Sequence, residues 1–304
     1  MIIKSVNYQS TGRISSETLG LIYGFVGVVC FSLTLPATRA AVADLDPIIV
    51  GLGRALVASA LAGLFLFIRR QPLPSRQQFK SLTIVAAGVV IGFPLLSTWA
   101  IHRVPAAHGA IVLGLMPLAT AVAAVLRAGE HPSRSFWSAS FAGSATVVAF
   151  ALVTGGGKAH IADLALVGAV VAAALGYAEG GRLARDLGGA QVICWALLVA
   201  APFLIVPVAS AVVKHGLAAS PTAWFGFAYV SVVSMFLGFF AWYRGLALGG
   251  IARVGQIQLL QPFLTIFASA ILLGEKVTSI TIGFAIAVVV CVVIGRAASV
   301  SRSK

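Results

Sequence analysis

The sequence contains few charged residues, and acidic residues are the scarcest of them. Asp, Glu, Lys and Arg together make up 10% of the 304 residues, and only 8 positions are Asp or Glu. Soluble globular domains carry about 25% charged residues, which excludes a water-soluble domain and also a soluble domain with one anchor. Because 60% of the residues are hydrophobic, the composition predicts a polytopic membrane protein.

Cysteine is also scarce, and the motifs of familiar catalytic sites are missing. Cys30, Cys194 and Cys291 each lie inside an apolar run, without pairing or metal-ligand spacing, and are predicted to be packed free thiols. The chain has no G-x-S-x-G, no H-E-x-x-H and no P-loop with its Gly-Lys-Ser/Thr. We therefore expect no enzyme activity, cofactor, metal site or ATP-driven transport. An intramembrane enzyme acting on lipid would need convergent acid, base or metal ligands, and the sequence shows none.

The 21 Lys and Arg residues give a formal net charge of +13 but form no basic patch or tract. They stand singly between apolar runs, which is the pattern of membrane-protein loops and not of a nucleic-acid-binding surface. The predicted partners are therefore the lipid bilayer and a small-molecule substrate, with no nucleic acid.

Charged residues separate ten apolar runs, because a charge at the centre of a bilayer is costly. Each run is close to the roughly 20 residues that cross the hydrocarbon core as a helix. Only Arg54 and Glu179 fall inside a run. The runs lie near residues 19–38, 47–68, 81–101, 105–126, 136–154, 164–181, 190–213, 224–243, 254–274 and 277–295.

An even number of crossings places both termini on the same side of the membrane. If that side is the cytoplasm, it carries roughly three times as many Lys and Arg residues as the other side, which agrees with the positive-inside rule. We therefore predict that both termini are cytoplasmic, with residues 1–18 as an N-terminal segment and 296–304 as a tail.

Two of the runs are similar to each other. The segment LGLMPLATAVAAVLRAGEHP begins at Leu113, and QLLQPFLTIFASAILLGEKV begins at Gln258. Aligning Pro117 with Pro262 also aligns a Thr, a Gly and a Glu of each segment at the same offset. Each repeat of five helices crosses the membrane an odd number of times. The second copy therefore enters the membrane from the opposite face, as in many secondary transporters. The predicted fold is all-α, with ten transmembrane helices in two inverted five-helix repeats, residues 19–154 and 163–295.

The two P-x12-GE segments, residues 117–130 and 262–275, resemble the drug/metabolite transporter superfamily in its ten-helix form with two EamA-type repeats. The resemblance extends over nearly the whole chain, which as a whole is most similar to amino-acid exporters of the YddG type. It implies a bacterial inner-membrane protein with a central cavity bordered by helices 3, 4, 8 and 9. It also implies efflux of small metabolites, with amino acids as the expected class, by alternating access.

Pro117 and Pro262 occupy matching positions in the two repeats, and both are predicted to be hinges. Proline has no N–H, so the carbonyls of Leu113 and Gln258, four residues earlier, are expected to lose their helical partners. Inside a membrane, such carbonyls are tolerated where protein or a water-filled cavity satisfies them.

Three glutamines, Gln256, Gln258 and Gln261, stand directly before the second of these prolines. The first repeat has apolar residues at the matching positions, so the polar cluster belongs to one half only. Because intramembrane polar groups usually face an interior, we predict that these glutamines line a substrate cavity. The alternative is interhelical hydrogen bonding, worth only about 0.6 kcal/mol per contact on average.

Helix 8 offers a second polar face, since Ser231, Ser234 and Trp242 fall on one helical stripe. This stripe either lines a substrate pocket or serves close helix packing, with Trp242 in the interfacial aromatic belt. Trp99, near the end of helix 3, is either an interfacial anchor or part of the wall of an outer cavity.

Three ionisable residues in or near the spans have both a functional and a structural interpretation. Arg54 either binds a substrate carboxylate, which a guanidinium pairs bidentately, or extends its head to the interface. Glu179 and His108 are candidates for proton coupling. Glu179 is alternatively a partner of Arg182 at i, i+3, and His108 a solvated group at the membrane edge.

Glu130 and Glu275 follow the two similar helices, each directly after a glycine, Gly129 and Gly274. The glycines are expected to be C-terminal helix caps. The acids are expected to favour the N-terminus of the next helix. Their predicted role is architectural.

Taken together, these features predict a secondary transporter that exports small metabolites, with amino acids, aromatic ones included, as the expected substrates. The sequence leaves open export of drugs, nucleobases or another metabolite. It also leaves open a passive channel or facilitator, and both proton-coupled transport and uniport.

Overall fold

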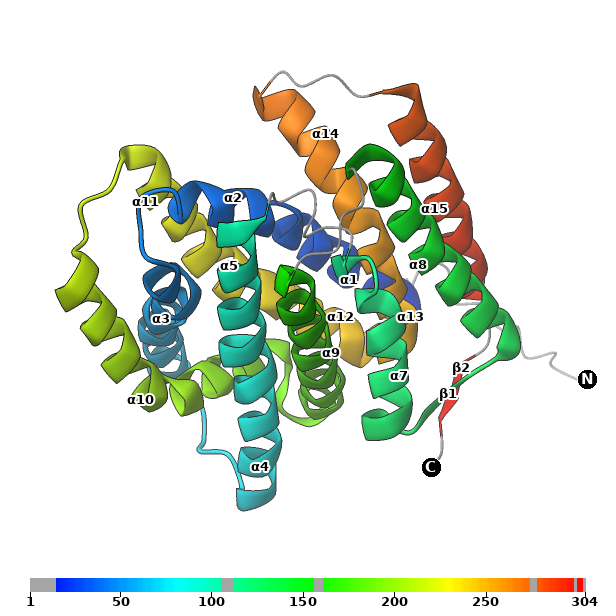
Figure 1. Cartoon of the computed structure of the whole chain (residues 1–304). Helices are drawn as coiled ribbons and strands as arrows, with labels where there is room; N and C mark the ends of the chain where they lie inside the picture. Colours follow the sequence, from blue (N-terminus) through cyan, green and yellow to red (C-terminus); the bar gives the residue numbers. More distant parts are fainter. Residues whose placement is uncertain (1–14, 105–111, 156–160, 274–277, 298–299, 303–304) are drawn as a thin grey trace, which may run out of the picture.

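The computed structural model of the chain describes residues 15–104, 112–155, 161–273, 278–297 and 300–302. The described chain is almost entirely helical (Figure 1), which confirms the all-α prediction. The exception is a short antiparallel pair, β1 (Glu130–Pro132) and β2 (Val300–Arg302).

Helices cover each of the predicted apolar runs at least in part, because backbone groups in a membrane must be satisfied within their own segment. The elements up to the middle of the chain are α1 (Ser16–Ser32), α2 (Thr34–Ala41), η1 (Ile49–Gly53), α3 (Arg54–Ile68), α4 (Arg76–Val85), η2 (Ala86–Gly92), α5 (Phe93–Arg103), α7 (Met116–Ala128) and α8 (Arg134–Gly155). The remaining helical elements are α9 (Ile161–Leu187), α10 (Gly189–His215), α11 (Pro221–Ala228), η3 (Tyr229–Leu237), α12 (Gly238–Gly249), α13 (Ile251–Gly255), η4 (Gln256–Leu260), α14 (Gln261–Leu273) and α15 (Ser279–Ala297).

Six continuous helical stretches of the described chain are long and apolar enough to cross a membrane. Two shorter apolar helices, Met116–Ala128 and Ser279–Gly295, lie among them. The chain is therefore a multi-pass membrane protein. The six long stretches are Ser16–Ala41, Ile49–Ile68, Arg76–Arg103, Ile161–Leu187, Gly189–His215 and Pro221–Gly249.

The helix ends follow local sequence rules. The hydroxyls of Ser15, Ser75 and Ser220 accept hydrogen bonds from backbone N–H groups in the first turns of α1, α4 and α11. At Ser75 the side chain of Gln78 completes a capping box. The C-terminal cap predicted for Gly129 is confirmed, since this residue ends α7 with a left-handed φ of 60°. Gly274 and Glu275 lie outside the described residues.

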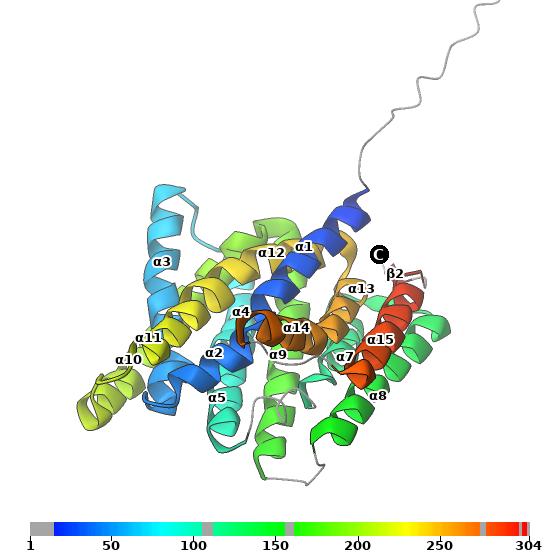
Figure 2. The same cartoon turned by 90° about the horizontal axis from the view of Figure 1, so that it is seen from above.

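Helix α9 occupies the centre of the bundle and packs against α4, α5, α7, α10 and α12. Figures 1 and 2 show α3, α10 and α11 on one flank of α9, with α8 and α15 on the other. The sequence of α9 is rich in Ala and Gly, which allows neighbouring backbones to approach closely. The central helix of the bundle is therefore rich in small side chains.

Helices α1 and α12 cross at two pairs of glycines with matching four-residue spacing. A Cβ added to Gly20 would lie 2.3 Å from the backbone nitrogen of Gly249, and one added to Gly245 would lie 2.6 Å from that of Gly24. This is the small-xxx-small contact by which membrane helices associate. It joins the first helix of the chain directly to the second half.

We expect Gly20→Val to destabilise the protein by about 1–3 kcal/mol, the usual cost of overpacking a tight core. The matched control is Gly283→Val on α15, where an added Cβ meets nothing within 4 Å. Thermal unfolding in detergent, followed by circular dichroism, compares the two variants. Equal midpoints for Gly20→Val and wild type would show that α1 and α12 do not depend on this contact.

Several helical stretches contain segments that depart from α-helical geometry. The segments η1, η2 and η3 are π-helical, η4 is a 3₁₀-helix, and Leu33 separates α1 from α2. Such departures from α-helical geometry often occur at functional positions. In a membrane protein, they are tolerated only where protein or a polar cavity satisfies the backbone.

Candidate functional site

A small cavity lies in the interior of the bundle, where these interruptions meet. Its volume is about 40 Å³, which is room for a few waters and far below the roughly 300–1,000 Å³ of ligand pockets. Its polar lining residues are Thr34, Arg54, Tyr177, Ser234 and Gln261. Its apolar lining includes Phe31, Phe93, Met116, Met235 and Phe239. Two larger hollows, of about 550 and 400 Å³, open on the outer surface of the bundle and are mainly apolar.

Arg54 begins α3 and is buried in the cavity wall, with 1% of its surface exposed. Its Nε and Nη2 atoms have no hydrogen-bond partner among the described residues. The interpretation that Arg54 extends its head to the membrane interface is therefore wrong, because the side chain is enclosed by protein. Arg54 lines the cavity together with Tyr177, with which it interacts electrostatically.

Two of the predicted helix 8 and helix 9 residues line the same cavity. The hydroxyl of Ser234, in η3, lies 2.8 Å from that of Thr34 in a buried hydrogen bond. Gln261, at the start of α14, donates from Nε2 to the carbonyl oxygen of Phe31 at 3.3 Å. The structure therefore brings Ser234 and Gln261 together with Arg54, as neighbours around one cavity.

The other two glutamines of helix 9 have different surroundings. Gln256 donates to the Ser140 hydroxyl of α8 at 2.8 Å, which is the interhelical hydrogen bond that the sequence offered as the alternative. Gln258 is buried behind the cavity wall, where its amide faces the Tyr177 side chain. Its Oε1 atom has no hydrogen-bond partner in the described part of the chain.

The expected loss of a partner at the Gln258 carbonyl is wrong. Residues 256–260 form a 3₁₀-helix, so the N–H of Gln261 donates to this carbonyl three residues back. Pro262 then falls in the first turn of α14, where a missing N–H costs little. Pro117 has the same place in the first turn of α7. The hinge role of both prolines stays a prediction.

A proline does remove a helical hydrogen bond at another position, which the sequence analysis did not identify. Pro36 cannot donate to the carbonyl of Ser32, four residues earlier, and the chain breaks at Leu33. The Thr265 hydroxyl of α14 donates to the Ser32 carbonyl. A side chain of the ninth helix thus satisfies the broken backbone of the first.

We expect Thr265→Val to destabilise the protein by about 1–3 kcal/mol, because the variant leaves the Ser32 carbonyl buried without its donor. Thr120→Val is a matched control, since Thr120 stands at the equivalent position of the first repeat. Its buried hydroxyl has no hydrogen-bond partner among the residues described. Thermal unfolding of both variants tests the assignment, and equal losses would contradict it.

The remaining candidates lie away from the cavity lining. The Ser231 hydroxyl donates to the Phe227 carbonyl of its own helix at 2.7 Å. Trp242 is fully buried and packs 5.3 Å from the ring of Tyr177, which does not fit an anchor in the interfacial belt. Trp99 stacks under the guanidinium of Arg103 at 3.8 Å. His108 lies outside the described residues.

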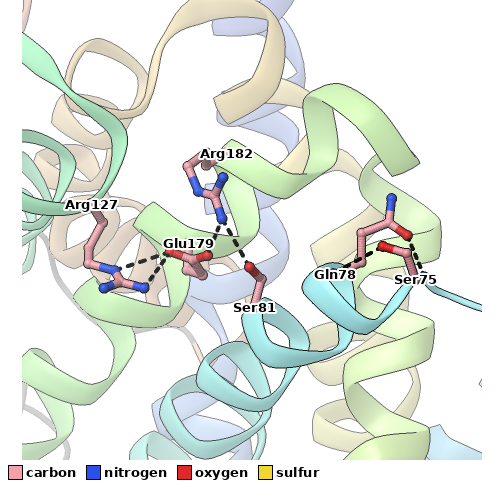
Figure 3. Close-up of polar contacts among 6 residues, drawn as sticks. All are labelled: Ser75, Gln78, Ser81, Arg127, Glu179 and Arg182. Carbon is pink, nitrogen blue, oxygen red and sulfur yellow. Dashed lines mark hydrogen bonds and ion pairs between the residues drawn. The ribbon is translucent and has the colours of Figure 1, made fainter.

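Glu179 is the centre of an ion-pair group at one end of the bundle (Figure 3). The carboxylate is 1% exposed and pairs with Arg182 on its own helix, as the i, i+3 spacing predicts. It also pairs with Arg127 of α7, whose Nε and Nη2 both approach Oε2, at 3.1 and 3.0 Å. Arg182 in turn donates to the Ser81 hydroxyl of α4 at 2.9 Å. The group therefore joins α4, α7 and α9.

Glu130 connects the same end of the bundle to the ninth helix. Its buried carboxylate accepts hydrogen bonds from the N–H groups of Ile251 and Ala252, at 3.0 and 2.8 Å, and pairs with Arg185 at 3.1 Å. The expectation that Glu130 favours the next helix in the chain is wrong. It caps α13 instead, because the fold places that N-terminus beside the end of α7. We call the Glu130 and Glu179 groups together the arginine end.

Interrupted helices around a central polar cavity, in a bundle that crosses the membrane several times, are the architecture of a secondary transporter. The chain belongs to the EamA-like transporter family, which matches residues 18–153 and again 160–295. This confirms the resemblance seen in the two P-x12-GE segments. The protein is a transporter and not an enzyme.

Related proteins are transporters as well. The chain is 47% identical over 283 residues to "Uncharacterized transporter YdeK" of Bacillus subtilis, covering 93% of this chain and 98% of that one. It is 28% identical over 257 residues to "Probable terminal-alkyne amino-acid exporter" of Streptantibioticus cattleyicolor, covering 82% and 83%. One solved crystal structure, at 15% identity, has a TM-score of 0.75 over 91% of this chain and 98% of its own, and shows the same fold.

Proposed function

We propose that this protein exports small amino-acid-type metabolites across a bacterial inner membrane by alternating access. Membership of the family indicates transport of a small molecule, and one relative is named as a probable amino-acid exporter. Within the bundle, the cavity combines a buried guanidinium and three hydroxyl groups with aromatic and sulfur-containing side chains. This lining suits a substrate that has a polar head and an apolar side chain.

We further propose ten crossings, arranged as two inverted five-helix repeats with both termini in the cytoplasm. The double match to the family and the similarity of the P-x12-GE segments support the duplication. Under this topology, the arginine end faces the cytoplasm, in agreement with the positive-inside rule.

The observation that carries alternating access is the closure of the bundle at the arginine end. On the arginine end, two buried carboxylates link helices of the first repeat to helices of the second. The cavity beyond them is too small for an amino acid in this conformation. We infer a state that is closed toward the cytoplasm, from which the two repeats must separate before substrate enters from that side.

Glu179 is less suited to proton coupling than its isolated position in the sequence suggests. Both of its oxygens are engaged by arginines, Arg127 and Arg182, and it lies at the arginine end and not in the cavity lining. We therefore favour a gating role for Glu179 and a uniport driven by the substrate gradient.

The test of substrate class is uptake of labelled compounds into proteoliposomes that contain the purified protein. We expect saturable uptake of one or more amino acids, reduced by an excess of the same unlabelled compound. Saturable uptake of a nucleobase or a drug, without any amino acid, would assign the protein to a different substrate class.

A further inference from the structure

Two buried side chains near the cavity carry unsatisfied atoms of opposite polarity. Arg54 has two free donors, Nε and Nη2, and Gln258 has one free acceptor, Oε1, within the part of the chain that the structure describes. Both side chains interact with the side chain of Tyr177, and Tyr177 and Arg54 both line the cavity. The two side chains with unsatisfied polar atoms therefore lie near the same tyrosine.

Orphans of this kind require an explanation, because more than nine in ten buried polar groups in proteins have a partner. An unpaired buried charge is the most costly case. Among the described residues, the buried carboxylates are Glu179 and Glu130. Neither pairs with Arg54, since Glu179 is engaged by Arg127 and Arg182, and Glu130 by Arg185 and α13. Within the part of the chain that the structure describes, Arg54 therefore has no counter-charge.

The free atoms of Arg54 have the right arrangement for a carboxylate. Nε and Nη2 lie on the same edge of the guanidinium plane, and this edge binds carboxylates through two parallel N–H donors. The same edge of another arginine contacts a carboxylate in this protein, since Nε and Nη2 of Arg127 both approach one oxygen of Glu179, Oε2. In Arg54, no described group accepts a hydrogen bond from the equivalent edge, which is covered by protein in this conformation.

The free acceptor of Gln258 complements an ammonium group. An amide oxygen accepts up to two hydrogen bonds and carries no charge, so it binds an ammonium without trapping a cation permanently. The apolar part of the cavity wall, which includes Phe31, Phe93 and Phe239, then remains for the side chain. The cavity offers no acidic lining residue among those described, which disfavours a substrate with net positive charge.

We propose that, once the cavity widens, Arg54 binds the carboxylate of a zwitterionic amino acid with an apolar side chain, and that Gln258, which the present cavity lining does not include, becomes accessible and accepts a hydrogen bond from the ammonium group. This inference rests on the proposed export of amino-acid-type metabolites. It adds the two residues that recognise the substrate. The cavity must widen for this substrate, which the interruptions at Leu33, η3 and η4 allow.

The experiment measures competition for uptake in proteoliposomes, with labelled L-phenylalanine or L-leucine as the transported probe. The competitors are the unlabelled amino acid, its methyl ester, the acid without the amino group, and the amine without the carboxylate. For wild type we expect the free amino acid to compete best. The acid and the amine each lose one contact, and the ester loses the carboxylate charge.

The variants separate the two positions. Arg54→Met should weaken competition by the amino acid and by the acid about 100-fold. Gln258→Leu should weaken competition by the amino acid about 10-fold and leave competition by the acid unchanged. These effects are the size expected for hydrogen bonds to charged groups. Thermal unfolding provides a readout independent of transport. Arg54→Met should unfold at the same or a higher temperature, because the variant removes an unpaired buried charge.

The outcomes distinguish this inference from the proposed function. Amino-acid uptake by wild type with unchanged selectivity in Arg54→Met would overturn the inference and leave the proposed function intact. A lower unfolding temperature of Arg54→Met, with unchanged selectivity, would assign Arg54 to the architecture of the bundle. Saturable uptake of another metabolite, without amino-acid uptake, would overturn both proposals.

Discussion

Glu179→Gln is expected to lower transport at least about tenfold and to open the arginine end. Glu179 holds Arg127 of α7 and, through Arg182, Ser81 of α4 against α9. The amide keeps the shape of the carboxylate but loses its charge, so two arginines lose their partner. A change of only about 1.4 kcal/mol in the balance between closed and open states shifts their populations tenfold.

The opening is measured by chemical labelling of a cysteine in the cavity. Met116→Cys, in a background with the three native cysteines replaced by alanine, places a thiol in the cavity lining. Inside-out vesicles are treated with a membrane-impermeant maleimide. We expect slow labelling when Glu179 is present and fast labelling with Glu179→Gln.

The matched control for this experiment is Glu17→Gln. Glu17 also pairs with an arginine, Arg253, at 2.7 Å, but its side chain is 47% exposed, and exposed pairs contribute little. Labelling and transport should therefore remain close to wild type. If Glu179→Gln and Glu17→Gln behaved alike, the Glu179 group would not hold the cavity closed.

Glu130→Gln is expected to destabilise the protein by about 2–4 kcal/mol, since the variant loses a buried ion pair and weakens a helix cap. The carboxylate accepts two backbone N–H groups of α13 and pairs with Arg185. An amide has one acceptor oxygen and turns its NH₂ group toward the other donors. The midpoint of thermal unfolding in detergent should therefore fall clearly.

Asp186→Asn is the control for the loss of negative charge next to Arg185. Asp186 is exposed at the end of α9, and surface substitutions of this kind usually change stability by less than about 0.5 kcal/mol. A midpoint for Glu130→Gln equal to that of Asp186→Asn would show that the cap and the ion pair do not stabilise the fold.

Local rules were sufficient for the helices and for the contacts within one helix. Charges in the sequence mark the ends of the apolar runs, and the structure forms helices over each of them. The cap at Gly129 and the pair between Glu179 and Arg182 follow from spacing alone. Such contacts are predictable because their geometry depends only on the helix to which they belong.

Contacts between distant segments could not be predicted in this way. The partners of Glu130 on α13 are more than 100 residues away, and spacing does not say which helix ends meet. Arg127 and Glu179 are 52 residues apart, and spacing does not predict their contact either. The sequence did contain the signal for the break at Leu33, since Pro36 obeys the rule that was applied to Pro262. The 3₁₀-helix before Pro262 removed the expected effect there.

Counterflow in proteoliposomes tests alternating access most directly. Vesicles are loaded with a high concentration of the unlabelled amino acid that the uptake panel identifies, and are diluted into a trace of the labelled form. A carrier that exposes its site to one side at a time predicts a transient accumulation of label above equilibrium, which disappears at equal concentrations. Label that only equilibrates, at a rate that increases linearly with concentration, would contradict the account and indicate a channel.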